Sequence, residues 1–181
     1  MKADAELVDA ALAGSVEAFG ELVGRYQAGL FRFLLTRCAT RADAEDALQD
    51  TFLAAFRYLA SYRRRWQFST WLYRIAIRNA ARLRIRPAEP LEDLPDERAD
   101  VLAECIRDAD AGNLWLEARR HLSPEAQAAL WLRYAEDLPV REVARALGRT
   151  QAWTKVTLLR ARRRLAAELA EETTGCGVLS G

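Results

Sequence analysis

The sequence predicts an all-α protein built from two small helical domains that are joined by an acidic linker. Helix-favouring Ala, Leu, Arg and Glu dominate the 181 residues, and the alternation of apolar and polar residues that is typical of strands is absent. The formal net charge is only +1, but basic and acidic stretches are segregated along the chain. We therefore expect a first domain over residues 1–86, a linker over 87–113, a second domain over 114–170 and a disordered tail over 171–181.

The first domain is predicted to begin with two helices. A short helix over roughly residues 4–13 ends at Gly14, and Ser15 can cap the helix that follows. Apolar residues at helical spacing on this second helix predict its buried stripe. They are Phe19, Leu22, Val23, Tyr26, Leu30 and Leu34.

A third helix is expected to begin near Asp43 and to carry two different faces. Its predicted buried stripe comprises Leu48, Phe52, Ala55, Phe56 and Leu59. Asp46, Gln49 and Asp50 recur at i, i+3 and i+4 on another face, where we expect them to be exposed. They are either solvated groups near a helix N-terminus, where the helix dipole favours carboxylates, or a docking patch for a basic protein surface.

The stretch from Thr51 to Ala88 contains no Asp and no Glu. Its arginines are Arg57, Arg63, Arg64, Arg65, Arg74, Arg78, Arg82, Arg84 and Arg86, and they alternate with Tyr58, Tyr62, Trp66, Phe68, Trp71 and Tyr73. Arginines neutralise phosphates and flat rings stack on exposed bases, so the combination suits a single-stranded or locally opened nucleic acid. The alternative is a solvated basic face above an ordinary aromatic core.

Within this stretch, residues 61–69 break the helical pattern. Ser69 or Thr70 is expected to cap a further helix, which runs to about Arg86 and is stopped by Pro87. Its predicted core stripe comprises Leu72, Ile75, Ala76, Asn79 and Leu83. A neighbouring stripe, which we interpret as a phosphate track beside a stacking platform, comprises Trp71, Arg74, Arg78 and Arg82.

The segment 87–113 is acidic and begins with three prolines, Pro87, Pro90 and Pro95, that oppose helix formation. Its acids are Glu89, Glu92, Asp93, Asp96, Glu97, Asp100, Glu104, Asp108 and Asp110. The segment is either a solvated tether or an acidic strand that occupies a positively charged channel.

The second domain carries a helix-turn-helix pattern. Ser123 and Pro124 predict a helix start, and a short helix over 139–147 is followed by Gly148 and a long helix. Residues 149–167 contain no acid. The predicted buried stripe of the long helix is Thr154, Leu158, Ala161, Leu165 and Leu169. Val156, Leu159, Arg160 and Arg163 are expected to lie away from it, with Trp153 between the two faces.

The sequence predicts neither a metal site nor a membrane-spanning segment. Cys38, Cys105 and Cys176 are far apart and His121 is the only histidine, so a zinc site of the usual types is not expected. No cofactor and no catalytic residue are predicted. The N-terminus lacks the apolar run of a signal peptide and no stretch is long enough to span a membrane, so we expect a cytoplasmic protein.

Two groups of motifs resemble one family. DAEDALQDTFL at 43–53 and FSTWLYRIA at 68–76 resemble region 2 of the extracytoplasmic-function (ECF) sigma factors of the sigma-70 family. LSPE at 122–125, LRYAEDL at 132–138, EVARALG at 142–148 and RARRRL at 160–165 resemble their region 4. The chain departs from the common pattern in the second helix of region 4, where it has Ala152-Trp153-Thr154-Lys155-Val156-Thr157.

This resemblance implies a factor that binds core RNA polymerase and directs promoter recognition, DNA melting and transcription initiation. It implies core polymerase binding by Asp46, Gln49 and Asp50, and a linker that runs through the polymerase cleft. It implies minus-ten DNA binding by Arg63, Arg64, Arg65, Trp66, Phe68, Trp71, Arg74, Arg78 and Arg82. It implies minus-thirty-five DNA binding by Arg149, Thr150, Gln151, Trp153, Lys155, Val156, Arg160 and Arg163. An anti-sigma factor is a further implied partner.

Two other functions compete with this one. A stand-alone helix-turn-helix regulator would explain the second domain, but it would leave the aromatic-basic loop and the acidic linker without a role. A nuclease or other DNA enzyme would need a cluster of carboxylates or histidines to hold a metal or to move protons. The basic segments contain neither, so the sequence favours a protein that is not an enzyme.

Overall fold

The computed structural model describes residues 2–85, 115, 118 and 120–175. All the regular elements in these ranges are helical, which confirms the predicted class. The chain divides into two compact units, residues 1–101 and 102–181. The predicted linker over 87–113 lies outside the described residues.

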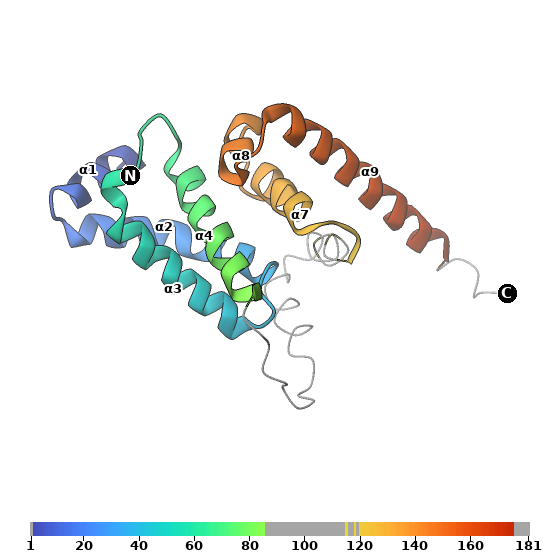
Figure 1. The fold of residues 1–181 in the computed structure, drawn as a ribbon, viewed down its shortest axis with the longest axis horizontal. Helices are drawn as coiled ribbons and strands as arrows, with labels where there is room; N and C mark the ends of the chain where they lie inside the picture. Colours follow the sequence, from blue (N-terminus) through green and yellow to red (C-terminus); the bar gives the residue numbers. More distant parts are fainter. Residues whose placement is uncertain (1, 86–114, 116–117, 119, 176–181) are drawn as a thin grey trace. The chain divides into compact units, whose positions relative to one another are not determined.

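Unit one consists of helices α1 (Asp4–Leu12), α2 (Val16–Leu35), α3 (Arg41–Arg57) and α4 (Phe68–Ile85), with a 3-10 turn, η1 (Leu59–Ser61), before the loop to α4. Helix α3 packs against both α2 and α4, and α1 packs against α2 (Figure 1). The loop of residues 62–67 therefore connects η1, at the end of α3, to the start of α4.

Local signals place the first three helices. Gly14 has a φ of +102°, a left-handed conformation that glycine adopts at little cost, and it separates α1 from α2. The Ser15 side chain accepts a hydrogen bond of 3.1 Å from the Ala18 amide, as predicted for an N-cap. Thr40 and Asp43 form a reciprocal capping box, with bonds of 3.0 and 3.1 Å, that starts α3 two residues before Asp43.

Helix α1 is held against α2 by polar contacts around Asp4. Its carboxylate accepts hydrogen bonds from the Arg25 guanidinium and the Tyr26 hydroxyl. Arg25 also donates to the Lys2 carbonyl at 3.0 Å. Burial raises the pKa of the Tyr26 phenol, and so does the bond that the phenol donates to Asp4. The Tyr26 hydroxyl thus stays protonated and donates a hydrogen bond at the edge of the core.

The predicted buried stripe of α3 is partly wrong. Small side chains form most of its buried face, namely Ala44, Ala47, Thr51 and Ala55, whereas Phe56 is 53% exposed. The buried face is turned from the predicted one by roughly a quarter turn at about 100° per residue. Small residues allow α3 to approach both of its neighbours closely, and Phe56 instead makes an edge contact with the Phe19 ring at 5.0 Å.

A polar contact lies inside the interface between α3 and α4. The Asn79 amide donates to the Thr51 hydroxyl oxygen at 3.2 Å, and both side chains are buried. Thr51 in turn donates to the Ala47 carbonyl at 2.6 Å. Asn79 therefore lies on the core face of α4, as predicted, while the preceding Arg78 is exposed.

Unit two contains α7 (Pro124–Leu130), a π-helical turn η2 (Trp131–Ala135), α8 (Val140–Leu147) and α9 (Gln151–Gly175). The Ser123 side chain caps α7 by accepting from the Ala126 amide at 3.3 Å, with Pro124 in the first turn, as predicted. Gly148 has a φ of +66° and terminates α8. Helix α9 continues to Gly175, beyond the predicted start of the tail at residue 171.

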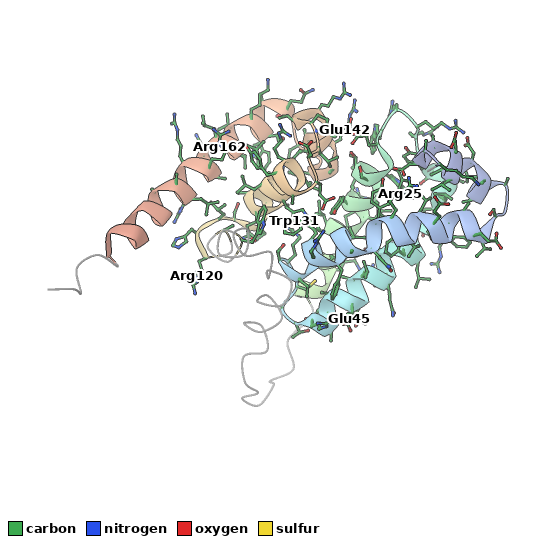
Figure 2. The ribbon with its side chains drawn as sticks, turned by 180° about the vertical axis from the view of Figure 1, so that it is seen from behind. Arg25, Glu45, Arg120, Trp131, Glu142 and Arg162 are labelled. Carbon is green, nitrogen blue, oxygen red and sulfur yellow. The ribbon has the colours of Figure 1, made fainter. Side chains whose placement is uncertain are left out.

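The helix-turn-helix of unit two is formed by α8 and α9, both of which pack against α7. Thr150 caps α9, since its hydroxyl accepts from the Trp153 amide at 3.1 Å. Thr154, Leu158, Ala161 and Leu165 of the predicted stripe are buried. Its last member, Leu169, lies within α9, but the structure does not describe its side chain. On α8, the side chain of Glu142, labelled in Figure 2, is buried. It accepts a hydrogen bond from Arg145 at 2.5 Å. This charge is therefore paired, as a buried carboxylate requires.

Candidate nucleic-acid interface

A pocket with a volume of about 270 Å³ lies beside the loop of residues 62–67. It is lined by Ser61, Arg63, Arg65, Trp66, Trp71, Arg74, Ile75 and Arg78. Half of these side chains are arginines and none is acidic, so the pocket favours an anionic occupant. Its volume lies just below the range of about 300–1,000 Å³ that is typical of small-molecule sites, which suits one flat ring with its attached phosphate.

Trp66 lies among cations at this pocket. The guanidinium of Arg74 is 5.6 Å from the centre of its ring, and that of Arg65 is 5.8 Å away. The backbone of the loop is fixed by two hydrogen bonds, from the Trp66 amide to the Arg63 carbonyl at 3.0 Å and from the Tyr62 hydroxyl to the Trp66 carbonyl at 2.6 Å. The indole is half-buried, so part of it remains available for stacking.

Phe68 is not part of this surface, contrary to the prediction. It is the first residue of α4 and only 3% exposed. Its ring is 5.6 Å from Tyr26, 5.6 Å from Tyr62 and 5.7 Å from Trp71. Neither Ser69 nor Thr70 starts the helix, because α4 begins before them. Phe68 thus precedes Leu72 by one helical turn and belongs to the same buried stripe.

The remaining predicted minus-ten residues divide between the pocket and its surroundings. Trp71 lines the pocket but is only 8% exposed, so its ring belongs mainly to the core. Arg82 is exposed on α4 outside the residues that line the pocket. Arg64 forms an ion pair with Asp9 of α1. This pair attaches the loop to the first helix, so Arg63 and Arg65 face the pocket while Arg64 faces away from it.

A second candidate surface lies on α3. Asp46, Gln49 and Asp50 are all exposed, as predicted. The sequence reasoning missed two apolar neighbours of this surface, Leu53, which is 64% exposed, and Phe56. Leu53 follows Asp46 by seven residues and therefore lies on the same helical face. The surface thus combines acidic groups with apolar area, a composition typical of a protein interface.

The third candidate surface is the exposed side of α9. Gln151, Lys155, Val156, Arg160 and Arg163 are all exposed. Two other predicted DNA contacts have partners within the protein. Arg149 pairs with Glu125 at 2.6 Å and stacks over the Trp153 ring at 5.2 Å, and the Thr150 hydroxyl serves as the helix cap. Arg162 and Arg164 are exposed as well, and Arg162 donates to the Tyr134 hydroxyl at 3.2 Å. By helical geometry Arg160 and Arg163 lie nearest to the side opposite the buried stripe.

Comparison with known proteins identifies both units. The sequence matches the family models Sigma-70 region 2 over residues 22–88 and Sigma-70 region 4 over residues 113–165. It is 33% identical to the ECF RNA polymerase sigma factor SigM of Mycobacterium tuberculosis, over 98% of this chain and 90% of that protein. The chain belongs to the ECF sigma factors of the sigma-70 family.

Two further relatives agree with this assignment. The ECF RNA polymerase sigma factor BldN of Streptomyces coelicolor is 33% identical, over 92% of this chain and 66% of that protein. The solved structure of CnrH in complex with the cytosolic domain of CnrY superimposes with a TM-score of 0.71 at 27% identity, over 94% of this chain and 99% of that chain.

As an ECF sigma factor, the protein directs RNA polymerase in promoter recognition and transcription initiation, and it belongs to a family without enzymatic activity. The two family matches account for both helical units, which a stand-alone regulator would not require. The pocket and the α3 surface lie within the region 2 match, and α8 and the first half of α9 lie within the region 4 match. Helix α1 precedes both.

Within the described ranges, no helix is both long enough and apolar enough to cross a membrane. The same residues contain no group of three or more His, Cys, Asp or Glu side chains that could hold a metal ion.

Proposed function

We propose that this sigma factor captures an unpaired base of the non-template strand in the arginine-lined pocket of unit one. The observation that carries the proposal is a pocket lined by Arg63, Arg65, Arg74 and Arg78 beside the half-buried Trp66 ring. The four arginines hold the sugar-phosphate backbone, and the exposed part of the indole offers a stacking surface for the base. A hydrogen bond within the loop and the Arg64–Asp9 ion pair to α1 hold the loop in place beside the pocket.

We also propose that α9 enters the major groove of the upstream promoter element. Its outward side carries Lys155, Arg160 and Arg163, and its N-terminal end is exposed, as helix-turn-helix readout requires. Transcription in vitro with purified core polymerase tests the two assignments together. We expect promoter-specific transcripts that depend on this protein, and their absence on every promoter with which it associates in cells would contradict the proposal.

We further propose that the α3 surface docks on core polymerase. Charge reversal in the double variant Asp46→Lys, Asp50→Lys is expected to weaken holoenzyme assembly, chiefly through a slower association rate at low salt. The fold should survive, because both side chains are exposed. Surface plasmon resonance with immobilised core polymerase measures the rate constants.

A matched control for this prediction lies on the same helix. Glu45, labelled in Figure 2, is exposed and pairs with Arg41 at 2.9 Å. At about 100° per residue, it lies roughly 100° from Asp46 and 140° from Asp50 around the helix. Glu45→Lys should associate nearly as fast as the wild type and should lose only about 0.5 kcal/mol of stability from the broken ion pair. Normal association of the double variant, or an equal defect in Glu45→Lys, would contradict the docking assignment.

For α9, Arg160→Ala and Arg163→Ala are each expected to weaken promoter binding across many sequences. Each loss of a phosphate contact should flatten the slope of log affinity against log salt by about one unit. Fluorescence anisotropy of the holoenzyme on labelled promoter DNA at several salt concentrations measures this slope. Arg162→Ala is the control, because the exposed Arg162 side chain donates to the Tyr134 hydroxyl and lies to one side of the outermost face of α9. A slope change in the control alone would refute the assignment.

We propose an anti-sigma factor as a further partner, and the cytoplasm, where core polymerase acts, as the place of action. Support for a regulatory partner comes from CnrH, which is solved in complex with the cytosolic domain of CnrY. The exposed apolar residues of the α3 surface, Leu53 and Phe56, offer area that such a partner could cover. Purification of the tagged protein from its native cell, followed by mass spectrometry, tests this proposal directly.

A further inference from the structure

The outermost row of α9 is apolar over its first turns. With roughly 100° between successive residues, the positions opposite the buried stripe are Ala152, Val156, Leu159 and Arg163. Ala152 is exposed, Val156 is 46% exposed and Leu159 is 43% exposed. The first three of these side chains have no group that can donate or accept a hydrogen bond. The part of α9 that is placed deepest in a DNA groove therefore cannot read bases by hydrogen bonding.

Positive charge surrounds this row. Lys155 lies on one side of it, Arg160 on the other, and Arg163 follows Leu159 by one turn, all of them exposed. No acid occurs between Arg149 and Ala167. A protein partner that covered the apolar row would have to accommodate these cations, whereas the phosphates of duplex DNA neutralise them. The charge pattern thus favours DNA as the occupant of this face.

Of the groups that bases present in the major groove, only the C5-methyl group of thymine is apolar. Guanine and adenine are read by paired hydrogen bonds from side chains such as Arg, Lys, Asn or Gln. Arg149 is held by Glu125 and Trp153. Gln151, at the first turn, lies roughly a third of a turn from the apolar row. Thymine methyl groups are therefore the features that this row can recognise.

We propose that Val156 and Leu159 select the upstream promoter element by contacting thymine methyl groups in the major groove. The inference rests on the proposed function of α9 as the groove-binding helix, and it adds the base class that the helix prefers. Val156 and Leu159 then determine sequence specificity, whereas the surrounding cations supply most of the affinity for DNA through phosphate contacts.

The test uses holoenzyme assembled from core polymerase and the full-length protein. Selection from a promoter library randomised in the upstream element gives the preferred sequence, and each preferred thymine is then replaced by uracil, which lacks only the methyl group. We expect wild-type binding to weaken about fourfold at one or more positions, the fold-change that corresponds to about 0.8 kcal/mol for a buried CH₂-sized group. The double variant Val156→Ala, Leu159→Ala should bind the thymine and uracil promoters equally.

Lys155→Ala is the matched control, because it should weaken binding to both promoters and preserve their ratio. Both apolar side chains are nearly half exposed, so the double variant should fold, and circular dichroism checks its helix content. Equal binding of thymine and uracil promoters by wild-type holoenzyme would overturn the inference while leaving the groove assignment intact. A thymine–uracil difference that persists in the double variant would overturn it as well. Complete indifference of the holoenzyme to the upstream sequence would instead refute the proposed function of α9.

Discussion

Replacement of Trp66 by alanine is expected to leave the closed promoter complex intact and to reduce DNA opening strongly. The unstacking of one base costs a few kcal/mol, and stacking on one aromatic side chain returns about 1–3 kcal/mol by alanine substitution. The population of open complexes should therefore fall by roughly 5- to 150-fold. Permanganate footprinting of unpaired thymines on a duplex promoter measures this population, and gel retardation measures the closed complex.

A second template separates two possible roles of Trp66. On a promoter that is already unpaired across the minus-ten element, rescue of the Trp66→Ala variant would show that the ring nucleates melting. Failure on both templates would show that the ring is needed to hold the strand itself. Tyr58→Ala is a suitable control, since Tyr58 is 57% exposed and does not line the pocket. Normal opening of the duplex by Trp66→Ala would falsify the assignment of the pocket.

Replacement of Phe68 by alanine is expected to destabilise unit one by about 3–5 kcal/mol, the range for truncating a buried aromatic side chain. The ring is 3% exposed and contacts three other aromatic rings. Small domains have a free energy of unfolding of only about 5–15 kcal/mol, so the loss consumes much of the total. Hydrogen exchange in peptides from α3 and α4, followed by mass spectrometry, reports on unit one separately from unit two.

The neighbouring Trp66→Ala variant is the matched control for stability. Its ring is half-buried at the pocket, so exchange in α3 and α4 should rise far less than in Phe68→Ala. Phe68→Leu keeps most of the apolar volume and should be intermediate. Wild-type exchange rates in Phe68→Ala would show that the aromatic cluster does not hold the helices together, and a role for Phe68 in DNA binding would have to be reconsidered.

The contrast between Trp66 and Phe68 shows where sequence reasoning succeeds and where it fails. Composition identifies the acid-free stretch, and helical spacing correctly places the arginines at 74 and 78 outside the core. The burial of Phe68 depends on the residue at which α4 begins. A start two or three residues later, after a cap at Ser69 or Thr70, would place the ring in the loop, and local capping preferences do not distinguish these starts.

Tertiary contacts decide the other differences. The pattern of large apolar residues on α3 suggests Phe56 as core, but close approach of α2 and α4 selects the alanine face instead. Arg64 is equivalent to Arg63 and Arg65 in the sequence, and only the position of Asp9, 55 residues away, directs it to α1. Likewise, the ion pair with Glu125, 24 residues away, engages Arg149 within the protein. Such pairings between distant residues leave no periodic signal in the chain.

The buried hydrogen bond between Asn79 and Thr51 has a mechanical consequence. It joins the helix that carries the proposed docking surface to the helix that carries Arg74 and Arg78. Sliding of one helix along the other would leave a buried amide without its partner, at a cost of about 1–3 kcal/mol. The bond therefore favours a single position of α4 along α3. If α3 docks on the polymerase as proposed, this bond helps to fix where Arg74 and Arg78 lie relative to the docking surface.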